Sequence, residues 1–355
     1  MKKTLLIAAL TLAAAPAMAS KARLAALNFA GHLEDIQDVF ANPSKAANYG
    51  EWLTFEFGTT PSTNATAAAD PKAEGGFSRA MGNANYGFYL GHHSTWITAA
   101  RQAAYLAPDN TVNLFYGSKA GEMAWGAGLE YSNSNKKSTQ QKQSALGLNG
   151  GVTMGHWDAA LNVGLTNTYN NDATSTEFKG KTGFDLSGSY TMNTMTFTAA
   201  YGMNGSGKED VAGTATHDTD ISSMSLGVVN SHKKDGADFF YGAKYKMDTT
   251  KDKIPDNKTE TTDLPVFAGI EADATSWMVL RASVQQNFLL GTTKVTTAGS
   301  GGEADTTANN TTVNAGAGLK FGKMTIDGTL TAAASNTAAL DGNNFLANGS
   351  LTYKF

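Results

Sequence analysis

Residues 123–131 read Met-Ala-Trp-Gly-Ala-Gly-Leu-Glu-Tyr, and this short stretch contains the pattern that decides the fold. Apolar or aromatic side chains stand at alternate positions, among them Met123, Trp125 and Tyr131, and glycine, alanine or Glu130 falls between them. Successive side chains of an extended strand point to opposite faces. The stretch therefore predicts a β-strand with one apolar face and one small or polar face.

The same alternation returns along most of the chain. Further segments that show it are 157–166, 184–192, 195–202, 237–247, 278–285, 313–321 and 324–331. Strands of ordinary domains cluster near five or six residues, whereas a tilted strand that crosses a membrane needs about nine to eleven. Because these runs are long as well as alternating, they predict an all-β chain that forms a transmembrane antiparallel β-barrel.

The connections between the predicted strands alternate between two kinds. Some are tight, such as Asn193-Thr194 and Gly322-Lys323, and others are long and polar, such as 248–263. Short turns at one end and long loops at the other are typical of outer-membrane barrels, with the turns in the periplasm. Counting back from the C-terminus predicts sixteen strands, and fourteen is the alternative if the weaker patterns at Trp52–Gly58 and Gly76–Met81 are not strands.

The amino-acid composition excludes several other classes of protein. The 355 residues contain no cysteine, which excludes a disulfide framework and a cysteine metal site. Beyond the N-terminus no run approaches the ~18 apolar residues of a spanning helix, and a formal net charge of -4 argues against a basic nucleic-acid binder. Glycine makes up 38 residues, above the average of about 7%, as expected for tight turns and small luminal positions.

The N-terminus predicts export. Lys2 and Lys3 precede an apolar run at 5–15, and Ala17-Met18-Ala19 is a small-x-small cleavage site, so residues 1–19 are predicted to be a signal peptide. Residues 20–50 are predicted to form a periplasmic or plug segment, with a helix over 32–41 that Asn42-Pro43 ends. A disordered leader is the alternative for that segment. The barrel is predicted to occupy 51–355.

The last residues carry a family resemblance. Leu351, Tyr353 and Phe355 share one face of the final strand, and the chain ends in the aromatic residue. This end resembles the C-terminal strand of Gram-negative outer-membrane proteins. The resemblance implies that the barrel-assembly machinery reads these three residues as an assembly signal, and that the barrel lies among outer-membrane lipid and lipopolysaccharide.

Two families within that class are similar to this chain. The overall pattern resembles the porins, which implies a homotrimer of sixteen-stranded barrels, each with a water-filled channel. The segment Asp38-Val-Phe-Ala-Asn42-Pro43 is similar to the N-terminal segment of the long-chain fatty acid transporters, which implies a fourteen-stranded barrel plugged by that segment. Here Ser44 stands where those transporters usually have alanine.

Alternation also assigns charged side chains to the lumen. The candidate pore-lining residues are Arg79, Arg101, Glu122, Glu130, Asp158, Asp185, Asp238, Lys244, Lys246, Glu271, Arg281, Lys320 and Asp327. On the strands alone, without Arg101 of the loop and with Glu56, Lys179, Lys181 and Lys354 added, eight acids stand against eight bases. This balance predicts a wettable lining with no dominant sign of charge. A loop over His92–Asn110 is predicted to fold inward and narrow the channel, with a strand pair or an external helix as alternatives.

These observations predict a porin that allows passive diffusion of small hydrophilic solutes and ions. No catalysis, cofactor or metal site is expected. The pair His217-Asp218 lies in a polar loop, where such a pair is usually solvated, and neither it nor His92-His93 has a recognisable catalytic or metal-binding spacing. Two alternatives stay open. One is a plugged barrel for hydrophobic substrates, and the other is a structural or adhesive barrel.

Overall fold

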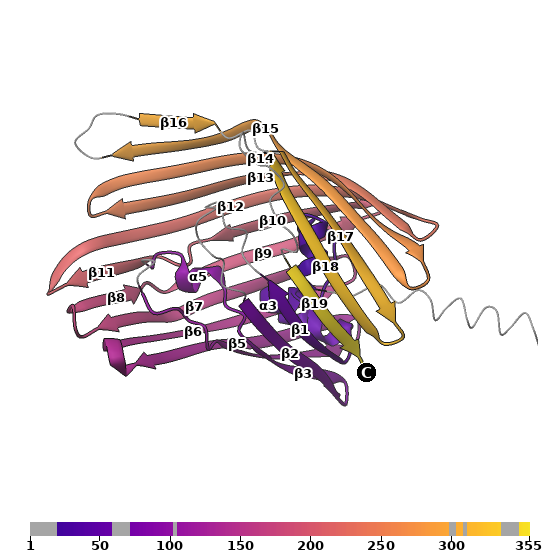
Figure 1. Ribbon diagram of the computed structural model, residues 1–355, viewed down its shortest axis with the longest axis horizontal. Coiled ribbons are helices and arrows are strands. Elements are labelled where there is room, and N and C mark those ends of the chain that lie inside the picture. Colours follow the sequence, from indigo (N-terminus) through magenta and orange to yellow (C-terminus); the bar gives the residue numbers. More distant parts are fainter. Residues whose placement is uncertain (1–19, 59–71, 102–104, 298–302, 308–310, 335–347) are drawn as a thin grey trace, which may run out of the picture.

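The computed structural model describes residues 20–58, 72–101, 105–297, 303–307, 311–334 and 348–355 (Figure 1). Its strands are β1 (Trp52–Gly58), β2 (Lys72–Met81), β3 (Ala84–Leu90), β4 (Val112–Ala120), β5 (Met123–Lys136), β6 (Gln141–Met154), β7 (Trp157–Asn171), β8 (Thr176–Gly180), β9 (Gly183–Met192), β10 (Met195–Gly202), β11 (Gly207–Val211), β12 (Thr214–Lys234), β13 (Ala237–Lys253), β14 (Asp256–Thr275), β15 (Met278–Thr297), β16 (Glu303–Thr307), β17 (Thr311–Phe321), β18 (Met324–Ala334) and β19 (Asn348–Lys354). The helices are α2 (Lys21–Ala26), α3 (Asp38–Ala41), η1 (Pro43–Lys45), α4 (Ala46–Tyr49), α5 (Thr95–Thr98) and η2 (Lys137–Thr139).

These strands form one closed antiparallel barrel. Within the described ranges sixteen of them follow one another around it, and β1 closes the circle by pairing with both β2 and β19. The remaining three, β8, β11 and β16, extend the wall at one end and pair with β7, β12 and β15. The predicted all-β barrel of sixteen strands is therefore confirmed, and the two weakly patterned segments at its start are the strands β1 and β2.

The outer surface of the barrel is apolar. On β5, Trp125 and Tyr131 are exposed, whereas Ala124 and Glu130 on the opposite face are buried. Other strands repeat this arrangement, and Phe55, Leu161 and Leu280 are further exposed examples. A continuous apolar belt of this kind is unfavourable in water but matches the hydrocarbon core of a membrane. No helix in the described part of the chain is long and apolar enough to cross a membrane.

Several predicted long loops are extensions of the strands. The connection predicted over 248–263 is a hairpin, in which β13 runs to Lys253 and β14 begins at Asp256. Strand β12 is 21 residues long, and its first residues form a second projecting hairpin with β11. A hairpin that projects beyond the membrane has water on both faces, so its residues need no apolar face. The strands therefore continue past the point where the alternating apolar pattern ends. Sequence periodicity therefore underestimates the strand lengths.

The inside of the barrel contains the hydrophobic core. Residues 20–50 fold into short helices that pack against the inward face of the wall, as Figure 1 shows for α3. One cluster joins Ile36, Val39, Ala46 and Tyr49 of this segment to Trp52, Tyr89 and Phe115 of the wall. A second cluster joins Leu27 and Ala30 to Val229 and Phe240. Residues 20–50 are called the luminal segment below, and the boundaries at 19 and 50 stay predictions.

The helix predicted over 32–41 is shorter in the structure. Only Asp38–Ala41 is helical, and the carboxylate of buried Asp35 accepts the Gln37 backbone N–H at 3.2 Å in the turn before it. Asn42 ends this helix as predicted and caps the next turn, because its Oδ1 accepts the Ser44 N–H at 3.1 Å. The apolar spacing that predicts a longer helix reflects contacts with the curved barrel wall.

Candidate functional site

A cluster of ion pairs fixes the luminal segment to the wall. Arg23 on α2 donates to Glu271 on β14 at 2.8 Å and to Asp35 at 3.4 Å. Arg281 on β15 donates to the same Glu271 at 2.7 Å and to Asp327 on β18 at 2.5 Å. The side chains of Arg281 and Asp327 are 0% exposed. Buried charges need partners of this kind, because their desolvation is costly.

This cluster corrects the prediction for three pore-lining residues. Glu271, Arg281 and Asp327 do face inward, as their alternation indicates, and the fold brings them together. However, α2 covers them, so they hold the luminal segment and do not line an open channel. Sequence reasoning missed Arg23 and Asp35, because neither lies on an alternating strand and nothing in the local pattern identifies their partners.

Burial and neighbouring charges shift the pKa values of the ionisable groups in the luminal segment. Burial raises the pKa of Asp35 well above its usual range, and the nearby Arg23 guanidinium opposes that rise only in part. Burial also raises the pKa of Asp38, although the hydroxyl that Tyr49 donates at 2.6 Å acts in the other direction. Burial by itself would lower the pKa of Arg23, but the Glu271 and Asp35 carboxylates raise it above its ordinary value.

The predicted inward loop does fold into the lumen. Figure 1 shows α5 inside the wall, toward the end where the long hairpins project. Trp96 and Ile97 of α5 cluster with Ala145 of β6, and Glu130 accepts the Ser94 N–H at 2.7 Å. Arg101 donates its Nε to Asn167 Oδ1 at 2.9 Å, and burial lowers its pKa to about 10. Glu130 and Arg101 thus hold this loop against the wall.

His92, at the start of the same loop, touches the luminal segment. Its ring stacks on Phe40 with the ring centroids 3.8 Å apart, and burial lowers its pKa well below the usual range. At the far end of the barrel, His217 lies 2.6 Å from Asp252, and not beside its sequence neighbour Asp218. Within the described ranges no three histidine or acidic side chains gather closely enough to hold a metal ion.

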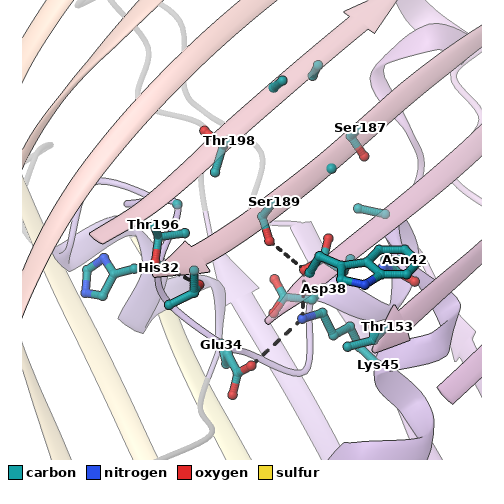
Figure 2. A pocket seen from close by; sticks show the side chains of 18 of the residues that line it. His32, Glu34, Asp38, Asn42, Lys45, Thr153, Ser187, Ser189, Thr196 and Thr198 are labelled. Atoms are coloured by element: carbon teal, nitrogen blue, oxygen red, sulfur yellow. Dashed lines mark hydrogen bonds and ion pairs between the residues drawn. The ribbon is translucent and has the colours of Figure 1, made fainter. Parts of the chain in front are cut away.

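Two cavities lie between the luminal segment and the wall. The first, of about 610 Å³, extends from Gly155 and His156 at the short-turn end along β7, β9, β10 and β12 (Figure 2). The second, of about 380 Å³, lies further from that end, between Asn28 and Phe29 and the strands β12 to β15. Both cavities are lined by Gly31, Thr198 and Lys244, so they meet at these three residues.

Hydroxyl groups and an ion pair line part of the first cavity. Figure 2 shows Ser187, Ser189, Thr196 and Thr198 in its lining. Asp158 accepts from Ser189 Oγ at 2.7 Å and pairs with Lys45 Nζ at 3.1 Å. The same Lys45 Nζ lies 3.8 Å from Glu34. A solute in this cavity would therefore meet hydroxyl groups and an ion pair that is already neutralised.

The other predicted pore-lining residues on β9, β13 and β17 also face the lumen. Asp185 accepts from Asn204 Nδ2 at 3.1 Å, and Asp238 accepts from Ser231 Oγ at 2.6 Å. Lys246 pairs with Asp248 at 2.5 Å, and Lys320 pairs with Asp273 at 2.7 Å. Lys244 differs from them, because no carboxylate of a described residue lies within 4.0 Å of its Nζ.

Two candidate pore-lining residues are placed elsewhere. Arg79 shares the outward face of β2 with Phe77, and its guanidinium lies 4.7 Å above the Phe355 ring and 3.0 Å from Glu51. A shift of one position reverses the face of a strand residue, and the short pattern of β2 led to that error. Glu122 is exposed in the turn between β4 and β5, and is not on the wall at all.

The three residues of the predicted assembly signal lie on the strand that closes the barrel. Leu351, Tyr353 and Phe355 share the outward face of β19 and its end, and β19 pairs with β1 and β18. Tyr353 and Phe355 contact each other edge to face at 5.3 Å between centroids. Their place on the outside is consistent with the predicted signal, which stays a prediction.

No protein-family model matches this chain, and no curated protein matches it either. Solved structures do share its architecture. A bacterial polysaccharide outer membrane secretin is 9% identical, with a TM-score of 0.47, over 86% of this chain and 97% of the other. The CymD monoaromatic hydrocarbon channel is 11% identical, with a TM-score of 0.46, over 94% and 97%. A porin is 12% identical, with a TM-score of 0.41, over 86% and 99%. The likeness concerns the barrel fold alone.

Proposed function

We propose that the protein is an outer-membrane channel for small hydrophilic solutes and ions, and that solutes pass between the luminal segment and the wall. The observation that carries this proposal is the pair of cavities that meet at Gly31, Thr198 and Lys244. A barrel of sixteen strands is too wide for its own side chains to fill. The luminal segment and the α5 loop fill part of the space, and the cavities remain beside them.

The chemistry of the cavities supports a polar cargo. Hydroxyl and amide groups line both, including Ser187, Thr198, Gln285 and Asn287. A channel for polar solutes needs such groups, which replace part of the water around the solute. A conduit for fatty acids would need a continuous apolar surface. Most apolar side chains of the luminal segment are instead packed against the wall in closed clusters, and Phe29 is the exposed one beside the second cavity.

A plugged barrel for hydrophobic substrates is the second candidate. The observation that favours it is the folded luminal segment itself, which occupies the lumen as a plug would. The fourteen strands of that alternative do not match the barrel described above. The hydroxyl and amide groups in both cavities favour the hydrophilic channel. The apolar outer belt supports a site of action within a membrane.

Planar-bilayer recording tests the proposed function. The purified full-length barrel should give stable, stepwise conductance in potassium chloride, and a change of gel mobility on boiling should confirm that it is folded. A trimer, which stays a prediction, would open in groups of three steps. Folded protein that inserts but gives no conductance would contradict the channel and favour a sealed or structural barrel.

Uptake of uncharged probes distinguishes the two candidates. Liposomes that contain the barrel should swell in small sugars, because these solutes can cross through polar cavities. Vesicles without protein, and vesicles with boiled protein, are the controls. Uptake of a long-chain fatty acid without any swelling in sugars would favour the plugged barrel for hydrophobic substrates.

A further inference from the structure

The luminal segment comes close to the wall where the two cavities share lining residues. A Cβ atom added to Gly31 would lie 2.9 Å from Thr198 Cγ2, so the luminal segment reaches the wall here. A Cβ atom added to Gly227 on β12 would lie 2.5 Å from Thr198 Oγ1 and 3.8 Å from Lys244 Cγ. Glycine at these two positions therefore allows Thr198 and Lys244 to share one narrow place.

The charge at this place comes from one residue. Of the three residues that line both cavities, Gly31 and Thr198 are neutral, and Lys244 is a cation. Its neighbour Lys246 is paired with Asp248 at 2.5 Å. Asp263 lies across the strand pair from Lys246 and accepts from Asn287 at 3.1 Å. Among the described residues, Lys244 has no carboxylate within 4.0 Å to neutralise it.

We propose that Lys244 is the selectivity-determining residue of the channel, and that it makes the route favour small anions such as carboxylates and inorganic anions over cations. This inference rests on the proposed function. A fixed charge at a constriction acts on every ion that passes, whereas charges in wider regions are screened by water and counter-ions. Paired charges elsewhere in the lumen contribute little, since each is neutralised by its partner.

A count of the charged residues on the luminal face predicts a different ion preference. The luminal face carries balanced acids and bases, which predicts no strong preference for either sign. The structure places most of those charges in ion pairs or under the luminal segment, as for Arg281 with Asp327 and Lys45 with Asp158. Selectivity then depends on Lys244, which has no ion-pair partner in the described part of the chain, and not on the sum of the luminal charges.

Reversal potentials in a potassium chloride gradient test the proposal. The unmodified barrel should show a preference for chloride over potassium. The Lys244→Glu variant should reverse the sign of the reversal potential, Lys244→Gln should bring it close to zero, and Lys244→Arg should keep the original sign. Lys233→Glu is the matched control, because it makes the same change of charge at a side chain that is 79% exposed at the short-turn end.

The outcomes separate this inference from the proposed function. Absence of conductance in every folded variant would overturn both. Conductance with an unchanged reversal potential in Lys244→Glu and Lys244→Gln would overturn the inference and leave the channel intact. An equal shift in Lys233→Glu would also overturn it, because the effect would then follow the net charge and not the narrow place. Gel mobility before and after boiling confirms that each variant is folded.

Discussion

Replacing Arg23 with alanine should release the luminal segment from the wall. The substitution removes the guanidinium that donates to buried Asp35, and it removes one of the two arginines that pair with the Glu271 carboxylate. Removing one member of a buried ion pair costs about 3–5 kcal/mol. Glu271 keeps Arg281 as a partner at 2.7 Å, so we expect the free-energy cost to lie near the lower end of this range, at about 3 kcal/mol. That cost corresponds to roughly a hundredfold change in the equilibrium between the docked and the released segment.

The assay for this variant combines single-channel recording with limited trypsin digestion. Arg23→Ala should give larger and less stable openings, and cleavage after Lys45 should become faster, since this side chain is only 12% exposed in the docked segment. Lys179→Ala is the matched control. It breaks an exposed ion pair with Glu177, and such pairs are worth about 0–1 kcal/mol. Unchanged conductance together with unchanged cleavage in Arg23→Ala would refute the anchoring role of this cluster.

Three further predictions concern the packing, the pH response and the assembly of the barrel. Trp52→Ala should lower the temperature of the gel-mobility transition, because Trp52 is 1% exposed and stacks on Phe115 and such truncations cost about 3–5 kcal/mol; an equal loss for outward-facing Trp125→Ala would contradict this. Burial raises the pKa of Asp35 and Asp38, so these carboxyl groups keep their protons in the docked segment at pH values where a released segment loses them. The protons therefore stabilise docking at low pH, and this contribution is lost as the pH rises through the raised pKa values. Conductance should therefore increase with pH over that window, and a profile that Asp35→Asn leaves unaltered would argue against this origin. Deletion of Tyr353–Phe355 should prevent assembly in the outer membrane, measured by membrane fractionation and gel mobility, and normal assembly would reject the proposed signal.

The wall of the barrel could be predicted from the sequence because it follows a simple physical rule. A strand between lipid and a lumen must alternate, and Trp125 with Glu130 shows the alternation within a few residues. The rule fails where the environment changes. Beyond the membrane, β12 and β14 continue as hydrogen-bonded strands without an apolar face. On the short strand β2, too few alternating positions were present to assign Arg79 correctly.

The contents of the lumen could be predicted only in part. The helical spacing at Ile36 and Val39 indicates that the luminal segment has an apolar face, and the two residues do lie in the core. The pairing of Arg23 with Glu271 joins residues 248 positions apart, and no local pattern encodes such a contact. The same limit applies to Gly31 and Thr198. Their importance depends on a contact between Gly31 and the Thr198 side chain, and only the folded chain brings these two residues together.

Disulfide trapping at the narrow place tests the central claim most directly, because the chain has no cysteine of its own. A Cβ atom at Gly31 would lie 3.9 Å from Thr198 Cβ, within the range of about 3.5–4.5 Å that a disulfide requires. The double variant Gly31→Cys with Thr198→Cys should therefore cross-link in the folded, membrane-inserted barrel. Gly31→Cys with Phe197→Cys, on the outward face of the same strand, should not. Free thiols in the folded first variant, or equal cross-linking in the second, would contradict a luminal segment that meets the wall at this point.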